Sequence, residues 1–323
     1  MKAPPITPLE AWSCRKIGLA VDRLPNREGL KAYQLRRLNQ TLAGVREHSP
    51  FYREKLRSLP PEPLETLEAL ADLPFTSAAE IRQDPLALLC VSQGRIARAV
   101  TLETSGTTGS PKRIFFTPAD LEMTLDFFHH GMATLVSPGQ RVLILLPGRL
   151  PDSVGDLLCR ALGRMNVQSV LPDLQCGLKQ VLEILRAERI GSIVGTPSQI
   201  IGLVRSWGEP RLPRGQIRSI LLTTDYVPRA IVSAVREAWG SRVFQHYGMT
   251  EMGYGGAVDC ALGNAYHLRE ADLFFEVVDP DTGRPLPEGE VGEIVFTTLT
   301  RRGMPLVRYR TGDLAALLPG TCA

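Results

Sequence analysis

The hydrophobic pattern near the N-terminus repeats every three or four residues. Within residues 30–49 the apolar positions form one stripe, which predicts an amphipathic helix. The stripe consists of Leu35, Leu38, Leu42 and Val45. A second helix is predicted to start at Ser77, because Glu80 follows at the spacing of a capping box. We therefore predict an N-terminal helical cap over residues 1–97.

From about residue 98 the pattern changes to short apolar runs separated by amphipathic segments such as 178–188 and 229–239. The apolar runs are RAVTLE, KRIFFT, RVLILLP, VQSVL, GSIVGT, RSILLT and RVFQHY. Alternating strands and helices indicate βαβ units around a largely parallel sheet. The pattern therefore predicts an α/β lobe over residues 98–254, built of βαβ sheets flanked by helices.

The helical pattern stops at about residue 255. The runs LFFEVV and GEIVFTTL follow, joined by the turn-rich stretch DPDTGRPLPEGE. Two strands connected by turn residues favour antiparallel pairing. We therefore predict a β-rich, barrel-like antiparallel lobe over residues 255–323, which completes an α/β fold with a helical cap.

The composition excludes several classes of function. The chain of 323 residues is 44% hydrophobic and 22% charged with a formal net charge of +3, which is ordinary for a globular protein. There is no run of five basic residues, so neither nucleic acid nor a membrane surface is an expected partner. The longest apolar run, VLILLP, is too short to span a bilayer, and the N-terminus does not resemble a signal peptide. We expect a cytoplasmic protein with reduced cysteines.

Residues 105–112 combine glycines, hydroxyl-bearing residues and a lysine. The glycines, hydroxyl-bearing residues and lysine of this segment are Ser105, Gly106, Thr107, Thr108, Gly109, Ser110 and Lys112. Flexible glycines let backbone amides converge on anionic oxygens, and the hydroxyls and the lysine add donors, which suits a triphosphate. The same composition also forms ordinary hairpin loops. It is not a Walker A loop, because the residues after Lys112 continue as a strand. The next helix is predicted to start only at Thr117, with Thr117 at the cap, Pro118 in the first turn and Asp120 as the acid at the third position of a capping box.

Three motifs occur in one order along the chain: TSGTTGSPK (104–112), HYGMTE (246–251) and YRTGD (309–313). In this order they resemble the AMP-forming adenylating superfamily of acyl-CoA synthetases. The stretches HSPFYREKL and VDPDTGRPLPEGEVGEIVFTTLTRRGMPLVRYRTGD resemble its phenylacetate-CoA ligase branch. The resemblance implies ATP, Mg²⁺ and coenzyme A as cofactors and a small carboxylic acid as substrate. It also implies formation of an acyl-adenylate, followed by thioester formation with release of AMP.

The resemblance assigns roles to residues at the matching positions. Tyr247, followed by Gly248, is expected to lie against adenine, and Thr250 is expected to meet the α-phosphate. Glu251 is expected to hold Mg²⁺, and Asp313 to accept hydrogen bonds from the ribose hydroxyls. Lys112 is expected to contact the β- and γ-phosphates. The adenine-facing loop departs from the usual Gly-Glu pair, and its nucleotide-binding positions are taken by Thr224, Asp225 and Tyr226.

A structural zinc site is a further hypothesis. Cys260, His267 and Cys322 would supply three of the four nitrogen and sulfur ligands that Zn²⁺ prefers. Buried free thiols are the alternative explanation of these cysteines, and their spacing favours it.

The chain ends ten residues after Asp313, whereas the family continues into a small C-terminal domain that brings a catalytic lysine. We therefore expect a shortened ligase that alone turns over weakly or not at all. The alternatives are an acyl-protein synthetase-like adenylating enzyme, which passes the acyl group to a protein thiol, and a catalytically silent nucleotide-binding module.

The acid substrate itself is not specified, because PGRLPDSVGDLL replaces the run that lines the family's acid pocket. A homodimer is compatible with the sequence.

Overall fold

The computed structural model describes residues 7–20, 27–102, 111–173, 176–206, 213–260 and 265–318. The α-helices are α1 (Pro8–Ile17), α2 (Arg27–His48), α3 (Pro50–Lys55), α4 (Ala78–Gln83), α5 (Pro118–Met132), α6 (Val154–Gly163), α7 (Leu178–Ala187), α8 (Pro197–Arg205) and α9 (Arg229–Trp239). Short 3₁₀ helices are η1 (Glu68–Asp72), η2 (Gln93–Arg95) and η3 (Thr250–Met252). The predicted helices of the N-terminal region and of segments 178–188 and 229–239 are confirmed, and α1 is an addition to them.

The strands of the described residues form three sheets. They are β1 (Arg98–Leu102), β2 (Lys112–Phe116), β3 (Arg141–Ile144), β4 (Gln168–Val170), β5 (Ser192–Gly195), β6 (Ser219–Leu222), β7 (Arg242–Tyr247), β8 (Ala257–Asp259), β9 (Tyr266–Leu268), β10 (Leu273–Val278), β11 (Gly292–Thr298) and β12 (Tyr309–Ala315). The largest sheet has the order β4-β3-β5-β6-β7-β8-β9. Its first five strands are parallel and β8 and β9 are antiparallel, so the predicted largely parallel sheet is confirmed.

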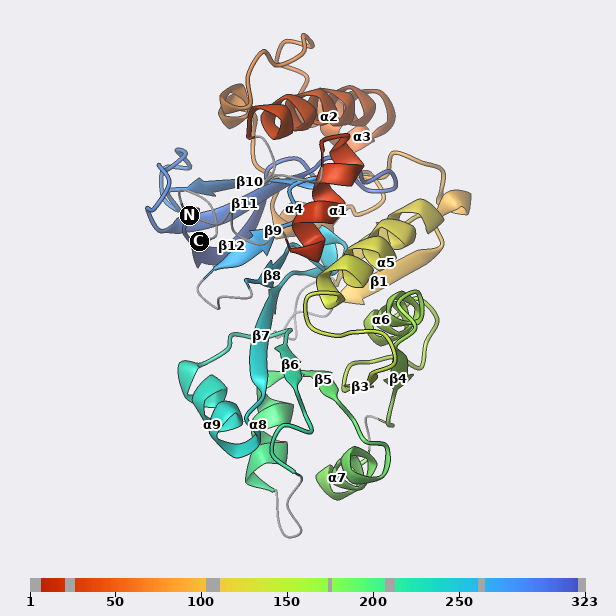
Figure 1. Ribbon diagram of the computed structural model, residues 1–323. Coiled ribbons are helices and arrows are strands. Elements are labelled where there is room, and N and C mark those ends of the chain that lie inside the picture. Colours follow the sequence, from red (N-terminus) through yellow and green to blue (C-terminus); the bar gives the residue numbers. More distant parts are fainter. Residues whose placement is uncertain are drawn as a thin grey trace.

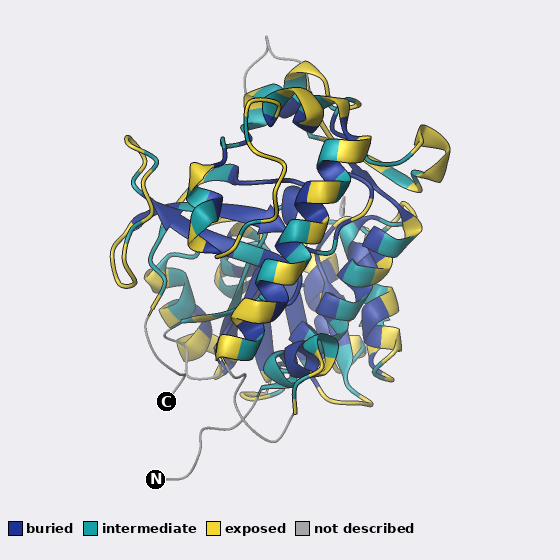
Figure 2. Ribbon diagram, turned by 90° about the horizontal axis from the view of Figure 1, so that it is seen from above, coloured by how far each residue is buried: buried dark blue, intermediate teal, exposed yellow. Residues whose placement is uncertain are grey.

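The parallel strands are covered by helices on both faces, which explains why they read as continuous apolar runs. Successive residues of a strand point to opposite faces. On β6, Leu221 packs into the core shared with α5 and α6, whereas Ile220 packs into the core shared with α7, α8 and α9. Figure 2 shows buried strands inside helices that each keep an exposed face.

Two antiparallel sheets complete the fold. Strands β10, β11 and β12 form a three-stranded sheet, which lies above the parallel strands in Figure 1, with β7 reaching toward it. Strands β1 and β2 pair antiparallel, so the predicted strand-loop-strand arrangement around the glycine-rich segment is confirmed. Strands β8 and β9 follow residue 254 but extend the large sheet rather than the three-stranded one. The predicted division into domains stays a prediction.

Helix α5 starts at the predicted capping box, which also ties it to a distant segment. The Thr117 side chain accepts a hydrogen bond from the Asp120 amide, and Asp120 Oδ2 accepts one from the Thr117 amide. Asp120 is only 3% exposed and also accepts hydrogen bonds from the amides of Arg302 and Gly303. The first turn of α5 is therefore fixed to the loop that leads into β12.

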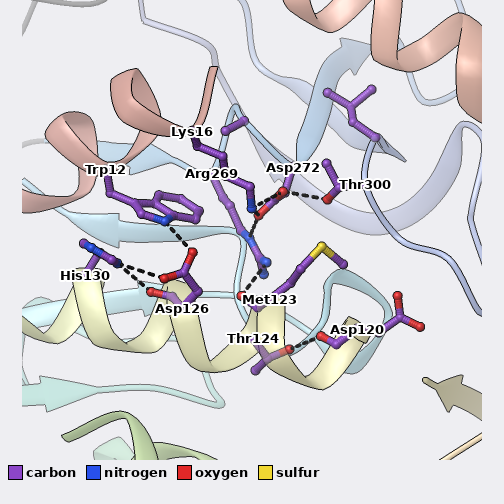
Figure 3. A network of polar contacts seen from close by, with 12 residues as sticks. Trp12, Lys16, Asp120, Met123, Thr124, Asp126, His130, Arg269, Asp272 and Thr300 are labelled. Atoms are coloured by element: carbon purple, nitrogen blue, oxygen red, sulfur yellow. Dashed lines mark hydrogen bonds and ion pairs between the residues drawn. The ribbon is translucent and has the colours of Figure 1, made fainter. Parts of the chain in front are cut away.

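Helix α1 is held against α5 and the loop before β10 by a network of polar side chains (Figure 3). Trp12 Nε1 donates to Asp126 Oδ2 on α5 over 2.6 Å. Lys16 Nζ lies 2.6 Å from Asp272 Oδ1, and Arg269 Nε donates to Asp272 Oδ2 over 2.8 Å. The N-terminal helix thus packs on the helix that begins just beyond the glycine-rich segment. Among the residues described, no helix combines the length and the apolar character needed to cross a membrane.

Candidate functional site

The candidate site lies where the parallel strands end. Strands β5, β6 and β7 run in the same direction, so their carboxyl ends meet at one edge of the sheet. Ligands of open α/β sheets bind in the crevice outside such an edge. Segment 224–226 follows β6 there, and the motif 246–251 completes β7 and enters η3.

Glu251 is the centre of a polar cluster at this edge. Its side chain is 3% exposed and forms an ion pair with Lys112, the first residue of β2. Tyr309, at the start of β12, donates its hydroxyl hydrogen to Glu251 Oε1 over 3.1 Å. Lys112 Nζ lies 3.2 Å from the same hydroxyl oxygen. The cluster thus joins one residue from each of the three sequence motifs.

Tyr309 is a site residue that sequence reasoning missed, although it is the first letter of the YRTGD motif. The residue is 2% exposed, and its hydroxyl lies between a cation and a carboxylate. Burial and the negative charge of Glu251 raise the pKa of Tyr309, so the phenol stays protonated and remains a donor at neutral pH. The signal available in the sequence was its place in this motif, because a tyrosine there can offer a hydroxyl that needs a partner if it is buried.

Tyr247 and Asp313, which the resemblance assigns to the adenosine group, are in direct contact. The Tyr247 hydroxyl donates to Asp313 Oδ2 over 2.9 Å. Burial and the charge of Asp313 raise the pKa of Tyr247. Asp313 is exposed on β12, so its carboxylate is accessible to a ligand. Their contact places the expected adenine-facing and ribose-facing side chains side by side, while the roles themselves stay predictions.

Gly248 follows Tyr247 where two backbone segments approach closely. A Cβ atom at this position would lie 2.7 Å from Gly255 Cα and 2.8 Å from the carbonyl oxygen of Tyr254. Only glycine therefore allows the end of β7 to lie against the segment that follows η3.

His246 precedes Tyr247 and is held as a neutral base. Its Nδ1 is 2.9 Å from Thr223 Oγ1. Its buried Nε2 has no hydrogen-bond partner among the described residues. Burial lowers the pKa of His246 to about 4, so the ring carries no charge at neutral pH.

The remaining predicted nucleotide-binding residues lie outside the buried cluster around Glu251. Thr224, Asp225 and Tyr226 are exposed in the loop after β6, and Tyr226 keeps 80% of its surface accessible. Thr224 has a positive φ of 72°, an unusual backbone conformation for a threonine. Thr250 is half-buried at the start of η3, where its carbonyl accepts a hydrogen bond from the Gly253 amide. The predicted loop residues Ser105, Gly106, Thr107, Thr108 and Gly109 lie outside the described residues.

The proposed zinc ligands are placed only in part. Cys260 is buried just after β8, and His267 lies on the adjacent strand β9. His267 Nδ1 is 3.2 Å from Glu10 Oε1, and the hydrogen bond to Glu10 raises the pKa of His267. Cys322 lies outside the described residues. Within the described ranges no three His, Cys, Asp or Glu side chains are arranged to hold a metal ion, so zinc stays a prediction.

Glu251 fits the magnesium role that the resemblance assigns to it. Mg²⁺ is commonly bound by one or two carboxylates together with substrate phosphates and water. In the structure a single buried carboxylate already contacts a cation, the ammonium group of Lys112. The donor set therefore suits an ion that takes most of its ligands from a nucleotide.

Comparisons with known proteins identify the family of the chain. The model of the family described as AMP-binding enzyme matches residues 97–299. The phenylacetate-coenzyme A ligase of Thermus thermophilus is 33% identical over 315 residues, with 94% of this chain and 68% of the relative covered. That of Pseudomonas putida is 29% identical, with 91% and 68% covered.

A solved structure of 2-hydroxyisobutyryl-CoA ligase, in an open conformation with 2-HIB-AMP and CoA, has the same fold with a TM-score of 0.80 at 22% identity. The aligned part covers 90% of this chain and 65% of that structure. The chain thus spans about two thirds of the length of these proteins. It belongs to the AMP-binding enzyme family, in the phenylacetate-coenzyme A ligase-like branch.

Proposed function

We propose that the chain is the large, nucleotide- and acid-binding part of an AMP-forming acid-CoA ligase. The observation that supports this most directly is the buried cluster of Lys112, Glu251 and Tyr309, which joins the family's three motifs at the edge of the sheet. Beside it, Tyr247 and Asp313 are in contact and offer a ring and a carboxylate to an adenosine group.

The proposed reaction has two steps. A carboxylate oxygen of the acid attacks the α-phosphorus of ATP, and pyrophosphate leaves with the electrons of the broken P–O bond. The thiol sulfur of coenzyme A then attacks the acyl carbon, the thiol loses its proton, and AMP leaves. Neither step requires a protein nucleophile, so the contribution of the protein is positioning and charge stabilisation.

The residues of this chain have separate tasks in that scheme. Asp313 would accept hydrogen bonds from the ribose hydroxyls, with Tyr247 beside the base. Glu251 would hold Mg²⁺, which would neutralise charge on the phosphates when bound. Lys112, released from Glu251 by the metal, would turn to the phosphate oxygens. Because Tyr309 stays protonated, its hydroxyl would keep Glu251 in place as the lysine moves.

The proposal predicts binding of ATP with Mg²⁺ that depends on Lys112 and on Asp313. Lys112→Ala removes a charged phosphate contact, and Asp313→Ala removes the ribose acceptor. Each substitution is expected to weaken binding about tenfold, the effect of losing one hydrogen bond to a charged group. Isothermal titration calorimetry with ATP and Mg²⁺ measures the change.

Arg113→Ala is the matched control, because Arg113 is the exposed basic neighbour of Lys112 on β2. It is expected to leave the affinity unchanged. No binding by the unsubstituted chain, or equal binding by all three variants, would contradict the proposal and favour a silent module.

A further inference from the structure

Arg301 lies in the loop between β11 and β12 and connects the HYGMTE motif to strand β2 through their backbones. Its Nη1 donates to the carbonyl oxygen of Glu251 over 2.6 Å. Its Nη2 donates to the carbonyl oxygen of Phe115, on β2, over 2.9 Å. We propose that Arg301 is a positioning residue that sets the placement of Glu251 relative to β2, and thereby the metal-dependent part of nucleotide binding. This inference rests on the proposed function.

The environment of Arg301 is unusual for a cation. The residue is 8% exposed, and no carboxylate of the described residues forms an ion pair with it. Its guanidinium carbon lies 4.4 Å from the centroid of the Phe116 ring, which stacks on Tyr254 at 5.4 Å with an interplanar angle of 7°. A buried charge without a direct ion pair costs free energy unless other contacts offset it. Here two carbonyls and an aromatic face contact the guanidinium, and the negative charges of Asp120 and Glu251 also favour its charged form.

The chemistry of the guanidinium explains why an arginine serves at this place. Its planar fork carries several donors in fixed directions and can bind two carbonyls at once. A lysine ammonium is a compact charge on a flexible chain, so we expect it to satisfy one carbonyl well and the other poorly. This position therefore requires a rigid group with two donors, and a positive charge alone is not sufficient.

The two segments that Arg301 joins carry the two charged groups of the site. Phe115 lies on the same strand as Lys112, and Glu251 supplies the carboxylate that Lys112 contacts. The distance between these segments therefore determines whether the Lys112 ammonium and a metal ion held by Glu251 can contact the same triphosphate. Arg301 would act on the nucleotide through the backbone, without touching it.

The test compares ATP affinity with Mg²⁺ and with EDTA, measured by isothermal titration calorimetry. Arg301→Met is expected to lose about tenfold in affinity when Mg²⁺ is present, because two carbonyls lose a charged donor, and to change little in EDTA. Arg301→Lys is expected to recover part of the loss. Arg302→Met, the exposed neighbour in the same loop, is the matched control and should bind as the unsubstituted chain does.

Thermal unfolding without ligand separates positioning from simple loss of stability. A folded Arg301→Met variant with a lower Tm and an unchanged affinity for ATP with Mg²⁺ would overturn the inference. If Arg301→Met does not fold, Arg301→Lys decides, and unchanged Mg²⁺-dependent affinity in that variant would overturn it equally. Failure of the unsubstituted chain to bind ATP would instead refute the proposed function, and the inference with it.

Discussion

Glu251 illustrates how much of the site depends on the surroundings of single residues. Its carboxylate contacts Lys112 and Tyr309, and its backbone carbonyl contacts Arg301. Charge-assisted hydrogen bonds of this kind are stronger than neutral ones, and low local polarity increases their effect. A residue at the end of a short motif is thereby fixed at both its side chain and its backbone.

His246 should make stability depend on pH below neutrality. An unfolded chain binds a proton at this histidine near pH 6.5, whereas burial delays protonation in the native state to about pH 4. The unfolded state therefore gains protons first as the pH falls. The free energy of unfolding keeps its full value above pH 6.5. It falls by about 2 to 3 kcal/mol in total as the pH drops from 6.5 to 4.

Urea unfolding at several pH values between 7.5 and 4.5 measures this loss. His246→Gln is expected to show a flatter pH dependence than the unsubstituted chain. His48→Gln is the control, because the His48 side chain is 53% exposed and its variant should retain the full pH dependence. Identical curves for all three proteins would refute the assignment of the effect to His246.

At the scale of elements, the capping box at the start of α5 also binds a distant loop. Both capping boxes predicted from the sequence, at Ser77 and at Thr117, are present. They are local features, set by residues three positions apart, and so they could be predicted without the fold. The additional amides that Asp120 receives come from residues more than 180 positions away and could not be predicted.

Removing the Asp120 carboxylate should therefore cost more than removing an ordinary capping side chain. Asp120→Ala is expected to lower the free energy of unfolding by about 3 kcal/mol, because the amides of Thr117, Arg302 and Gly303 lose their acceptor. Ser77→Ala, at the N-cap of the other capping box, should cost about 1 kcal/mol. Chemical denaturation of both variants provides the comparison, and equal losses would show that the tie to the loop before β12 contributes nothing.

At the scale of the whole molecule, helix α1 is attached through buried charges. Asp272 is 2% exposed and contacts Lys16, Arg269 and Thr300 (Figure 3). Burial alone would raise the pKa of Asp272, but the charges of Arg269 and Lys16 lower it. One carboxylate thus neutralises two cations and joins α1 to the loop before β10.

Substitutions of Asp272 and of Lys16 should lower the free energy of unfolding by different amounts. Asp272→Asn leaves Lys16 and Arg269 without their counter-charge and is expected to cost about 3 kcal/mol of unfolding free energy. Lys16→Met leaves Asp272 paired with Arg269 and should cost only about 1 kcal/mol. Denaturant unfolding gives both values, and hydrogen exchange should show α1 opening first in Asp272→Asn. A smaller loss for Asp272→Asn than for Lys16→Met would contradict this account of the network.

The amino-acid sequence alone was sufficient to predict the alternation of strands and helices that begins near residue 98, the capping boxes and the three motifs with their family. These features depend on period, on short spacings and on residue type, all of which act locally along the chain. The contacts of Tyr309 and Lys112 with Glu251, the bridge of Arg301 between Glu251 and β2, and the packing of α1 on α5 are visible only in the folded structure. Such contacts join residues far apart in the chain, and their strength comes from burial, which exists only once the sheets and helices have packed together.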